Sequence, residues 1–372
     1  MDFTPTEAQV DLTQLTRAIT GKLVTPERLR ELDSDEDRFD ESLWRALADA
    51  GVLAAGLPES VGGGGFGVLE QSSVLIELGR ALADVPYLSS IALGASALAE
   101  FGSVEQQEWA RQAGSGDTVL TVALAEEGND DPARPVTRAE PDESGWVLTG
   151  AKITVPAATF ADRILVPAAT PDGIAVFLLD PNAAGVSIER QQVVDLSAEA
   201  VVEMSGVRVD STALVGSVER GAEIADWLVT RAEVGLSALQ VGTLSRALEL
   251  VGDYARERVQ FDRPIGSFQA VAQRLADAYI DVKGARLSQL QAAWRLGEGL
   301  PSEAEVRIAK FWAADAGHRV AHTVIHIHGG VGLDRDHPVH RYFLAAKHNE
   351  FALGSATEQL RRLGAVLASV PA

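Results

Sequence analysis

The sequence predicts an α+β fold with three consecutive parts: a helical region, an antiparallel β-barrel or sandwich, and a four-helix bundle. Apolar residues first recur at intervals of three and four, then form short apolar or alternating runs, and finally return to long helical spacings. The periodicity therefore changes twice, and we place the domain boundaries at these changes. The predicted domains are residues 1–116, 117–218 and 219–372.

The first region is predicted to be a bundle of short helices. In Leu69–Leu82 the apolar residues follow helical spacing, and Pro26, Pro58–Gly67 and Pro86 interrupt the pattern around it. Proline lacks a backbone N–H and does not continue a helix, so each interruption separates two predicted helices.

The middle region is predicted to be a β domain. Its apolar runs are short, and Gly, Pro, Asp and Asn separate them, which is typical of strands joined by turns. The predicted strands are Thr118–Ala125, Trp146–Val155, Arg163–Ala168, Ile174–Leu179, Val186–Val194 and Ala200–Val209.

The last region is predicted to be a second bundle, built from longer helices. Helical spacing of the apolar residues persists over stretches long enough for a bundle of four or five helices. The predicted helices are Glu223–Val259, Phe268–Leu296, Ser302–Ile327, Val339–Leu353 and Glu358–Ala368.

Composition excludes several classes of function. The chain has 372 residues, no cysteine and a formal net charge of -21. Nucleic-acid backbones are bound by clustered Lys and Arg, so this charge argues against nucleic acid as a partner. Without cysteine there are no disulfides, thiolate nucleophiles, iron–sulfur clusters or cysteine zinc sites. Neither a signal peptide nor an apolar run of about 18 residues is evident, so we expect a cytoplasmic protein without a membrane span.

The stretch Ala255–Ala270 contains a forced break between two helices. Pro264 has no backbone N–H and disfavours the α conformation at Arg263, so the preceding helix is expected to end near Val259. Ser267 is a residue type that caps helix N-termini, and we expect it to cap the next helix.

Three side chains around this break suggest a phosphate-bearing cofactor. A guanidinium on structured backbone binds phosphate oxygens bidentately, which Arg258 could do. Phe261 offers a flat apolar face, and Gln269 offers both a donor and an acceptor. Taken alone, the pattern is also compatible with an arginine that forms a salt bridge at a helix end.

Several motifs, taken together and in this order, resemble the acyl-CoA dehydrogenases over nearly the whole chain. They are Pro58–Gly67 leading into Glu77–Arg80, then Arg258–Gln269, and finally His328–Gly332 leading into His337–Phe343. The resemblance implies the fold of that family, with FAD as cofactor and an acyl-CoA as substrate.

The resemblance also implies that these motifs contact the adenosine and pyrophosphate of a neighbouring subunit's FAD. Glycines let backbone N–H groups approach a phosphate closely, and Arg258 supplies positive charge. One position departs from the family, because residue 326 is usually Gln and is His here. The implied flavin-contact residues are Arg258, Gln260, Phe261, Phe268, Gln269, His326, Gly329 and Gly330.

The family's catalytic base is missing. The resemblance implies a carboxylate that removes the α-proton of the acyl thioester, and its usual position falls on Leu353. The second position known in the family falls on Ala232. Glu233 is one residue away and rotated by about 100° on a helix, so it is either a base or a solvated or salt-bridged residue. We expect the isolated chain to be essentially inactive.

The pocket for the flavin ring also departs from the family. In Gly150–Ala157, Thr154 falls where an aromatic residue is usual, and Pro156 falls where a hydroxyl and a backbone N–H would bond the flavin. The turn Ala125–Asp130 lacks the small hydroxyl residues expected near the flavin and the thioester. We therefore expect that this β domain does not bind a flavin of its own.

These losses suggest a heteromeric enzyme in which a paralogous subunit supplies the flavin-ring pocket and the catalytic glutamate. The chain most resembles the non-catalytic subunit of actinobacterial steroid acyl-CoA dehydrogenases, which implies an α2β2 heterotetramer and a steroid side-chain CoA thioester as substrate. An electron-transferring flavoprotein is the implied acceptor. Two alternatives stay open: a self-sufficient flavin monooxygenase or dehydrogenase of the same fold, and a structural partner without cofactor.

All seven histidines lie between His318 and His348. His318, His322 and His326 stand at four-residue intervals, which is a spacing that can chelate zinc. No glutamate of the His-Glu-x-x-His kind accompanies them, so we expect no metal and assign His326 to contact with flavin or adenosine.

Overall fold

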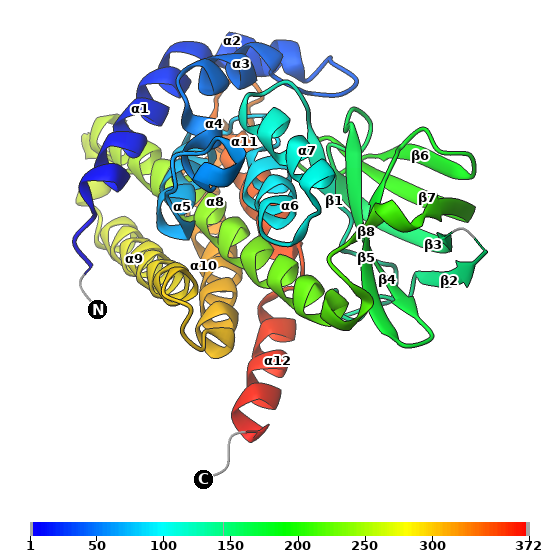
Figure 1. Cartoon of the computed structure of the whole chain (residues 1–372). Coiled ribbons are helices and arrows are strands. Elements are labelled where there is room, and N and C mark those ends of the chain that lie inside the picture. Colours follow the sequence, from blue (N-terminus) through cyan, green and yellow to red (C-terminus); the bar gives the residue numbers. More distant parts are fainter. Residues whose placement is uncertain (1–2, 144, 370–372) are drawn as a thin grey trace. The chain divides into compact units, whose positions relative to one another are not determined.

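The computed structural model describes residues 3–143 and 145–369, and its helices and strands follow the predicted order (Figure 1). Contacts between Cα atoms divide the chain into two compact units. The helical unit comprises Met1–Leu29, Ser72–Ala83 and Glu233–Ala372, and the mixed unit comprises Arg30–Gln71 and Asp84–Ala232. Helices α2 (Pro26–Leu32), α5 (Val68–Ala81) and α8 (Gly221–Glu257) contain residues of both units. The three-domain division stays a prediction.

The helical unit consists of long helices and one short hairpin. Besides its parts of α2, α5 and α8, its elements are α1 (Glu7–Leu23), β9 (Val259–Gln260), β10 (Arg263–Pro264), η5 (Ile265–Ser267), α9 (Gln269–Gly297), α10 (Glu303–His328), η6 (Gly329–Leu333), α11 (Val339–Phe351) and α12 (Ala356–Ser369).

Four of these helices share one apolar core, as the predicted bundle requires. Val251 of α8, Val282 of α9, Val320 of α10 and Tyr342 of α11 belong to the same cluster of buried side chains. Helix α10 is central, because it packs against α9, α11 and α12. In Figure 1 the red helix α12 continues beyond the end of α10. The buried residues of these helices recur at the helical period of 3.6 residues, as expected for helices that each bury one face.

The mixed unit combines short helices with a sheet. Its helical elements are α3 (Glu41–Asp49), α4 (Val52–Ala55), η1 (Glu59–Val61), η2 (Tyr87–Ala95), α6 (Ser96–Phe101), α7 (Val104–Gly114), η3 (Ser211–Ala213) and η4 (Val218–Arg220). Its strands are β1 (Leu120–Val122), β2 (Arg138–Asp142), β3 (Gly145–Pro156), β4 (Arg163–Thr170), β5 (Gly173–Leu179), β6 (Val186–Gln191), β7 (Glu199–Asp210) and β8 (Leu214–Val215).

In the described part of the chain these eight strands form one sheet, in the order β6-β7-β3-β2-β4-β5-β8, with β1 paired to β4. Most neighbours are antiparallel, as predicted, but β1 and β2 each run parallel to β4. Strand β2 was not predicted. Its sequence Arg-Ala-Glu-Pro-Asp is polar and only Ala139 is buried, so it lacks the apolar pattern that identifies a strand.

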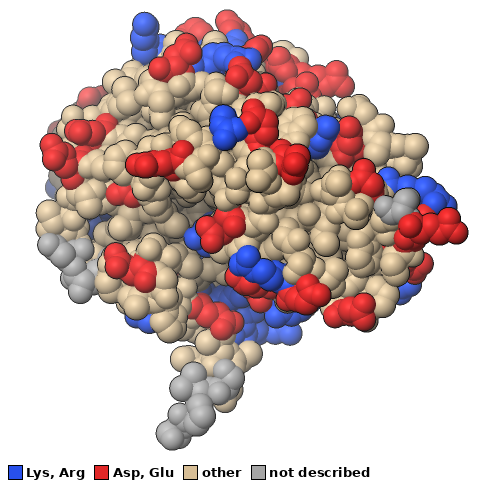
Figure 2. All heavy atoms as spheres, viewed as in Figure 1, with Lys and Arg blue, Asp and Glu red and all other residues tan. Residues whose placement is uncertain are grey.

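The surface carries both signs of charge. On the face shown in Figure 2, basic side chains lie next to acidic ones, and no broad basic area is visible. Within residues 3–143 and 145–369, no helix is long and apolar enough to cross a membrane.

Candidate functional site

The predicted break after α8 is a β-hairpin. Helix α8 ends at Glu257, and β9 then pairs antiparallel with β10, with Gln260 opposite Arg263. Between them, Phe261 and Asp262 have φ angles of 52° and 63°. Two successive residues with positive φ form the tight turn that matches the twist of paired strands. The hairpin therefore fixes the backbone on both sides of Pro264.

The expected capping role of Ser267 is wrong. Phe268 is the N-cap residue of α9, and it makes no side-chain capping bond. The Ser267 hydroxyl instead donates to the carbonyl of Pro264 at 2.7 Å, within the short turn η5. The first N–H groups of α9 consequently lack a side-chain cap.

The polar side chains of this corner are exposed. The guanidinium of Arg258 makes no hydrogen bond or ion pair with any residue that the structure describes, and neither does the amide of Gln269. The alternative of a salt-bridged helix end is therefore not what the described residues show. The Gln260 amide donates to the carbonyl of Val259 at 2.9 Å.

The aromatic side chains of the corner support one another. Phe261 is 87% exposed at the turn. Its ring meets the ring of Phe268 edge-on, with centroids 6.1 Å apart, and the guanidinium of Arg263 lies 4.1 Å from the Phe268 ring centroid. Phe261 thus presents an apolar face at the tip of a rigid hairpin, as the sequence predicted.

The second group of predicted flavin-contact residues lies where α10 ends. His326 is exposed on the last turn, and Gly329 follows with φ 60° and ψ −134°. Only glycine adopts this conformation without strain. A side chain at Gly329 or Gly330 would meet no atom within 4 Å, so the backbone here is open to a ligand.

The two groups are joined by a contact between Tyr254 and His328. Their rings stack with centroids 4.4 Å apart, and the Tyr254 hydroxyl donates to the His328 carbonyl at 3.5 Å. Tyr254 precedes Arg258 by one helical turn, since the N–H of Arg258 donates to the Tyr254 carbonyl at 2.8 Å. His328 directly precedes Gly329. The helical unit therefore brings both groups of predicted residues to the same end.

His328 was not among the predicted contact residues. It is 3% exposed, and its Nδ1 lies 2.8 Å from the carbonyl of Val324, so Nδ1 carries the proton. Its Nε2 is buried and has no hydrogen-bond partner among the described residues. In the sequence, His328 could have been singled out by its position next to Gly329. Its ring packs against Tyr254, which explains why an aromatic residue stands here.

The residues present fit the FAD that the resemblance implies. Arg258 and Gln269 supply exposed donors without protein partners, and Gly329 and Gly330 leave backbone open. A guanidinium and a side-chain amide are donors that a pyrophosphate accepts from, and backbone without a side chain lets a phosphate approach closely. Phe261 provides the apolar face that an adenosine ring needs.

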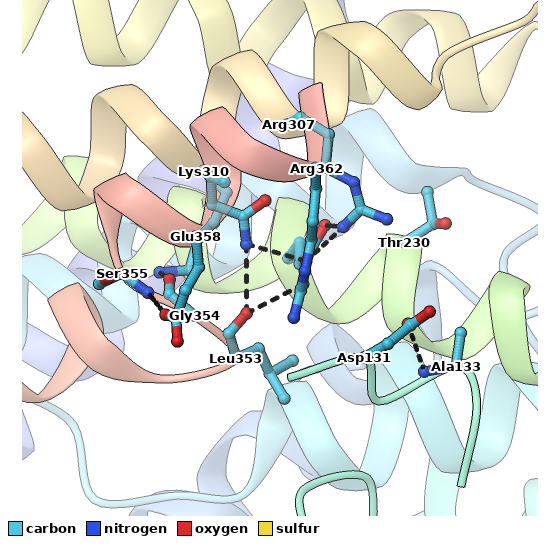
Figure 3. A network of polar contacts seen from close by, with 12 residues as sticks. Asp131, Ala133, Thr230, Arg307, Lys310, Leu353, Gly354, Ser355, Glu358 and Arg362 are labelled. Carbon is cyan, nitrogen blue, oxygen red and sulfur yellow. Dashed lines mark hydrogen bonds and ion pairs between the residues drawn. The ribbon is translucent and has the colours of Figure 1, made fainter. Parts of the chain in front are cut away.

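The usual position of the catalytic base lies in a turn that side-chain hydrogen bonds hold in place. Leu353 lies between α11 and α12 with φ 54°, and its side chain has no group that accepts a proton. Its carbonyl accepts hydrogen bonds from Gln359 at 3.1 Å and Arg362 at 3.4 Å (Figure 3). The second base position, Ala232, is a buried methyl group. Neither position can remove a proton.

Glu233 is a buried ion-pair anchor. Its carboxylate is 0% exposed and accepts from Arg307 Nη1 at 2.6 and 2.5 Å, from Arg362 Nη1 at 3.1 Å and from Gln359 Nε2 at 3.1 Å. Of the two sequence interpretations, the salt-bridged one fits, although the residue is buried and not solvated. Two guanidinium groups and an amide occupy its carboxylate oxygens, so this carboxylate serves a structural contact.

Lys310 holds the same turn from the other side and was missed by sequence reasoning. Its ammonium is fully buried and donates to the carbonyls of Asn349 at 3.0 Å, Glu350 at 3.3 Å and Gly354 at 3.1 Å. Figure 3 shows Lys310 beside Leu353 and Gly354. Burial lowers the pKa of Lys310 to about 8, despite nearby carboxylates. A lysine on the apolar face of a predicted helix was the available signal.

In the mixed unit, β3 stands at the position where the family has its flavin-ring residues. Here other parts of the same chain occupy its backbone. The pairing of β3 with β7 is irregular between Lys152 and Val155, and Thr154 within this bulge has φ 47°. The Thr154 N–H donates to the side-chain oxygen of Gln191 at 2.6 Å. Pro156 pairs opposite Glu199 and has no N–H. Strand β3 therefore offers no free backbone donor at Thr154 or Pro156.

The turn Ala125–Asp130, which lacks the small hydroxyl residues of the family, is held in place by the buried carboxylate of Glu126. Glu126 accepts from the N–H groups of Val136 at 2.7 Å and Thr137 at 2.8 Å and from the Lys152 ammonium at 2.8 Å. Burial alone would raise the pKa of Glu126, but Lys152 and the hydrogen bonds outweigh it and lower that pKa to about 2. An ion pair thus shapes this turn.

The histidine cluster does not form a metal site in the described residues. The rings of His318 and His322 are 4.6 Å apart, and His318 Nδ1 lies 3.2 Å from Glu350 Oε1 and 3.1 Å from the Lys347 ammonium. A lysine at this distance repels a cation. No group of three potential metal ligands occurs in residues 3–143 and 145–369.

Comparisons with known proteins identify the family of this chain. Models of the N-terminal and C-terminal domains of acyl-CoA dehydrogenases match residues 6–117 and 219–368. The chain is 52% identical to acyl-CoA dehydrogenase FadE27 of Mycobacterium tuberculosis over the full length of both.

Two solved structures are also similar. A chain of the ChsE4-ChsE5 complex from Mycobacterium tuberculosis matches with a TM-score of 0.95 and 53% identity, covering 100% of both chains. A chain of the Tcur3481-Tcur3483 steroid acyl-CoA dehydrogenase matches with a TM-score of 0.92 and 38% identity, covering 97% of this chain and 98% of that one. The protein therefore belongs to the acyl-CoA dehydrogenase family, whose enzymes depend on FAD.

Proposed function

We propose that this chain is the non-catalytic subunit of a heteromeric, FAD-dependent acyl-CoA dehydrogenase, assembled as α2β2 with a paralogous subunit. One observation carries the proposal: donors for a flavin's pyrophosphate are intact and open, whereas both base positions lack a proton acceptor. Arg258 and Gly329 illustrate the first half, and Leu353 and Ala232 the second. A paralogous subunit would supply the catalytic glutamate and the pocket for the flavin ring.

In this assignment the residues of the chain bind and orient, and they transfer no proton. Arg258 would hold the pyrophosphate of the partner's FAD by charge-assisted hydrogen bonds, and the open backbone at Gly329 and Gly330 would let the pyrophosphate approach closely. Phe261 and Phe268 contact the adenosine portion, and Gln260, Gln269 and His326 complete the set. When bound, FAD would supply the acceptor for the β-hydride of the acyl thioester, and the α-proton would go to the carboxylate of the partner subunit.

The substrate class that we propose is a steroid with a CoA thioester on its side chain, dehydrogenated between Cα and Cβ. Support comes from the similarity to a chain of a steroid acyl-CoA dehydrogenase and to a chain of a two-component complex. Reoxidation by an electron-transferring flavoprotein is part of the same proposal and follows from the family. No described residue is assigned to the sterol nucleus.

Flavin stoichiometry tests this function. The chain should purify alone without flavin absorbance, and co-expression with its paralogue should give one FAD per pair of unlike chains. The expected ratio follows from a chain that contacts a neighbour's FAD but does not bind the ring. One FAD per chain in the lone protein, together with turnover of an acyl-CoA, would instead establish a self-sufficient flavoenzyme. If the FAD content of the complex did not depend on this chain, the chain would be a purely structural partner.

A further inference from the structure

Arg231 is the exception among the arginines of α8. Arg246 pairs with Glu249 at 3.0 Å, and Arg256 pairs with Asp253 at 3.1 Å. Arg231 makes no hydrogen bond or ion pair with any residue in the described part of the chain. The sequence has 53 acidic residues against 32 Lys and Arg, so carboxylates are not scarce. An unpaired guanidinium in such a chain calls for a physical explanation.

The Arg231 side chain lies at one end of a column in which two aromatic rings stand between two arginines. Its guanidinium carbon lies 3.8 Å from the centroid of the Trp227 ring. The Trp227 ring meets the Phe101 ring edge-on, with centroids 5.5 Å apart. Arg220, itself paired with Glu223 at 2.9 Å, lies 4.9 Å from the Phe101 centroid. The indole thus covers one face of the Arg231 guanidinium and leaves its N–H edge without an acceptor.

The guanidinium of Arg231 is partly withdrawn from water, but none of its nitrogens is fully buried among the residues that the structure describes, so its N–H edge is open to an acceptor. Arg231 is only partly exposed, and burial lowers the pKa of its guanidinium, which Glu100 offsets only in part. Glu100 is itself exposed and makes no ion pair with Arg231 in the described residues. A guanidinium has five N–H donors, and donors withdrawn from water without an acceptor cost free energy. An oxygen anion at the open edge would satisfy them bidentately.

We propose that Arg231, backed by Trp227, is a binding site for an oxyanion of an acyl-CoA ligand, either a phosphoryl group or a carboxylate. Arg231 immediately precedes Ala232, one of the two vacant base positions. The site rests on the proposed function only for the identity of the ligand that carries the oxyanion. The chain thereby keeps a recognition element for the ligand although it has lost the base.

Chemical modification of the unaltered heteromeric complex tests the site directly. Phenylglyoxal reacts with accessible guanidinium groups, and peptide mass spectrometry reports the reaction at each arginine. Arg231 should react faster than the paired Arg246, and CoA should slow its reaction while leaving Arg246 unchanged. Free pantetheine, which lacks phosphate, is the probe that identifies a phosphoryl ligand by failing to protect. Protection by succinate but not by inorganic phosphate identifies a carboxylate.

A matched set of variants gives the second test. Arg231→Gln should weaken binding of the protective probe to this chain by at least about ten-fold, because a charged hydrogen-bond donor is removed. Arg231→Lys should keep part of the affinity, and Arg246→Gln should keep all of it. Protection of Arg231 by none of CoA, inorganic phosphate and succinate would overturn the proposal, as would unchanged affinity in Arg231→Gln. Flavin content of the complex is measured in parallel, and it should not change, so this test is separate from that of the Arg258 contact.

Discussion

Tyr254 and His328 stack ring on ring, with centroids 4.4 Å apart and planes inclined by 24°. Tyr254 lies one turn before Arg258, and His328 lies one residue before Gly329. The two motifs are 74 residues apart at this contact, yet the stack brings them to one end of the helical unit. The relative position of the two proposed flavin-contact groups therefore depends on a pair of aromatic rings that contact no ligand in this proposal.

The stack should control flavin retention indirectly. In the co-expressed complex, Tyr254→Ala removes the ring contact and should weaken FAD binding by about five-fold, because aromatic pairs contribute about 1 kcal/mol beyond burial. Tyr254→Phe keeps the ring and loses only a long hydrogen bond, so it should bind FAD normally. Release of fluorescent FAD on dilution measures both. Equal retention in Tyr254→Ala and the unaltered complex would show that the two groups do not depend on this contact.

Arg258 should act on flavin directly. Arg258→Ala removes an exposed guanidinium with no protein partner, so the change should leave the fold intact. FAD affinity in the complex should fall by about 1.5–3 kcal/mol, the usual contribution of a charged hydrogen bond. The matched control is Arg256→Ala, since Arg256 is a nearby exposed arginine that pairs with Asp253. If both variants retain FAD equally, the assignment of Arg258 is wrong.

The helices and most strands could be predicted from the sequence because their apolar periodicity reflects one buried face. Strand β2 could not, since its pairing with β3 and β4 is made by the backbone while its side chains are polar. The cap at Ser267 failed for a related reason. Sequence identifies a hydroxyl at a helix start, but the local turn decides which backbone group lies within its reach.

The candidate site was predictable where it consists of contiguous motifs and not where it depends on tertiary contacts. Arg258 and Gly329 were identified from their own neighbours in the sequence. Glu233 on α8 forms ion pairs with Arg307 on α10 and Arg362 on α12. These pairs join different helices, and no local sequence pattern predicts them. The same holds for the capture of the Thr154 N–H by Gln191.

The stability of the mixed unit should fall in acid because of Glu126. Its pKa is lowered to about 2 in the folded protein, against an ordinary value of 4.5, so the folded state favours the carboxylate. The resulting stabilisation is complete above about pH 4.5 and is lost as the pH falls towards 2. Thermal unfolding measured across this range should show a steeper decline for the unaltered chain than for Glu126→Gln. Parallel declines would mean that this ion pair does not set the acid response.

Restoring the missing carboxylate should not restore catalysis. Leu353→Glu places a carboxylate at the usual base position, but Pro156 still lacks an N–H and Gln191 still occupies that of Thr154. We expect no dye reduction by the isolated variant with acyl-CoA substrates and added FAD. The complex containing this variant should turn over at the rate of the unaltered complex. Activity in the isolated variant would show that its β domain binds a flavin ring.

Glu233 should be required for stability and not for proton transfer. Glu233→Gln leaves Arg307 and Arg362 facing a neutral group in a buried position, and breaking a buried ion pair costs about 3–5 kcal/mol. Denaturant unfolding of the lone chain should show this loss. Arg220→Gln is the control, because it breaks the exposed pair with Glu223, and water screens such a pair, so the free energy of unfolding should change little. If Glu233 were instead a catalytic base, its substitution would reduce turnover by the complex at pH values where the complex remains folded. The salt-bridged geometry predicts unchanged turnover in every preparation that retains the fold.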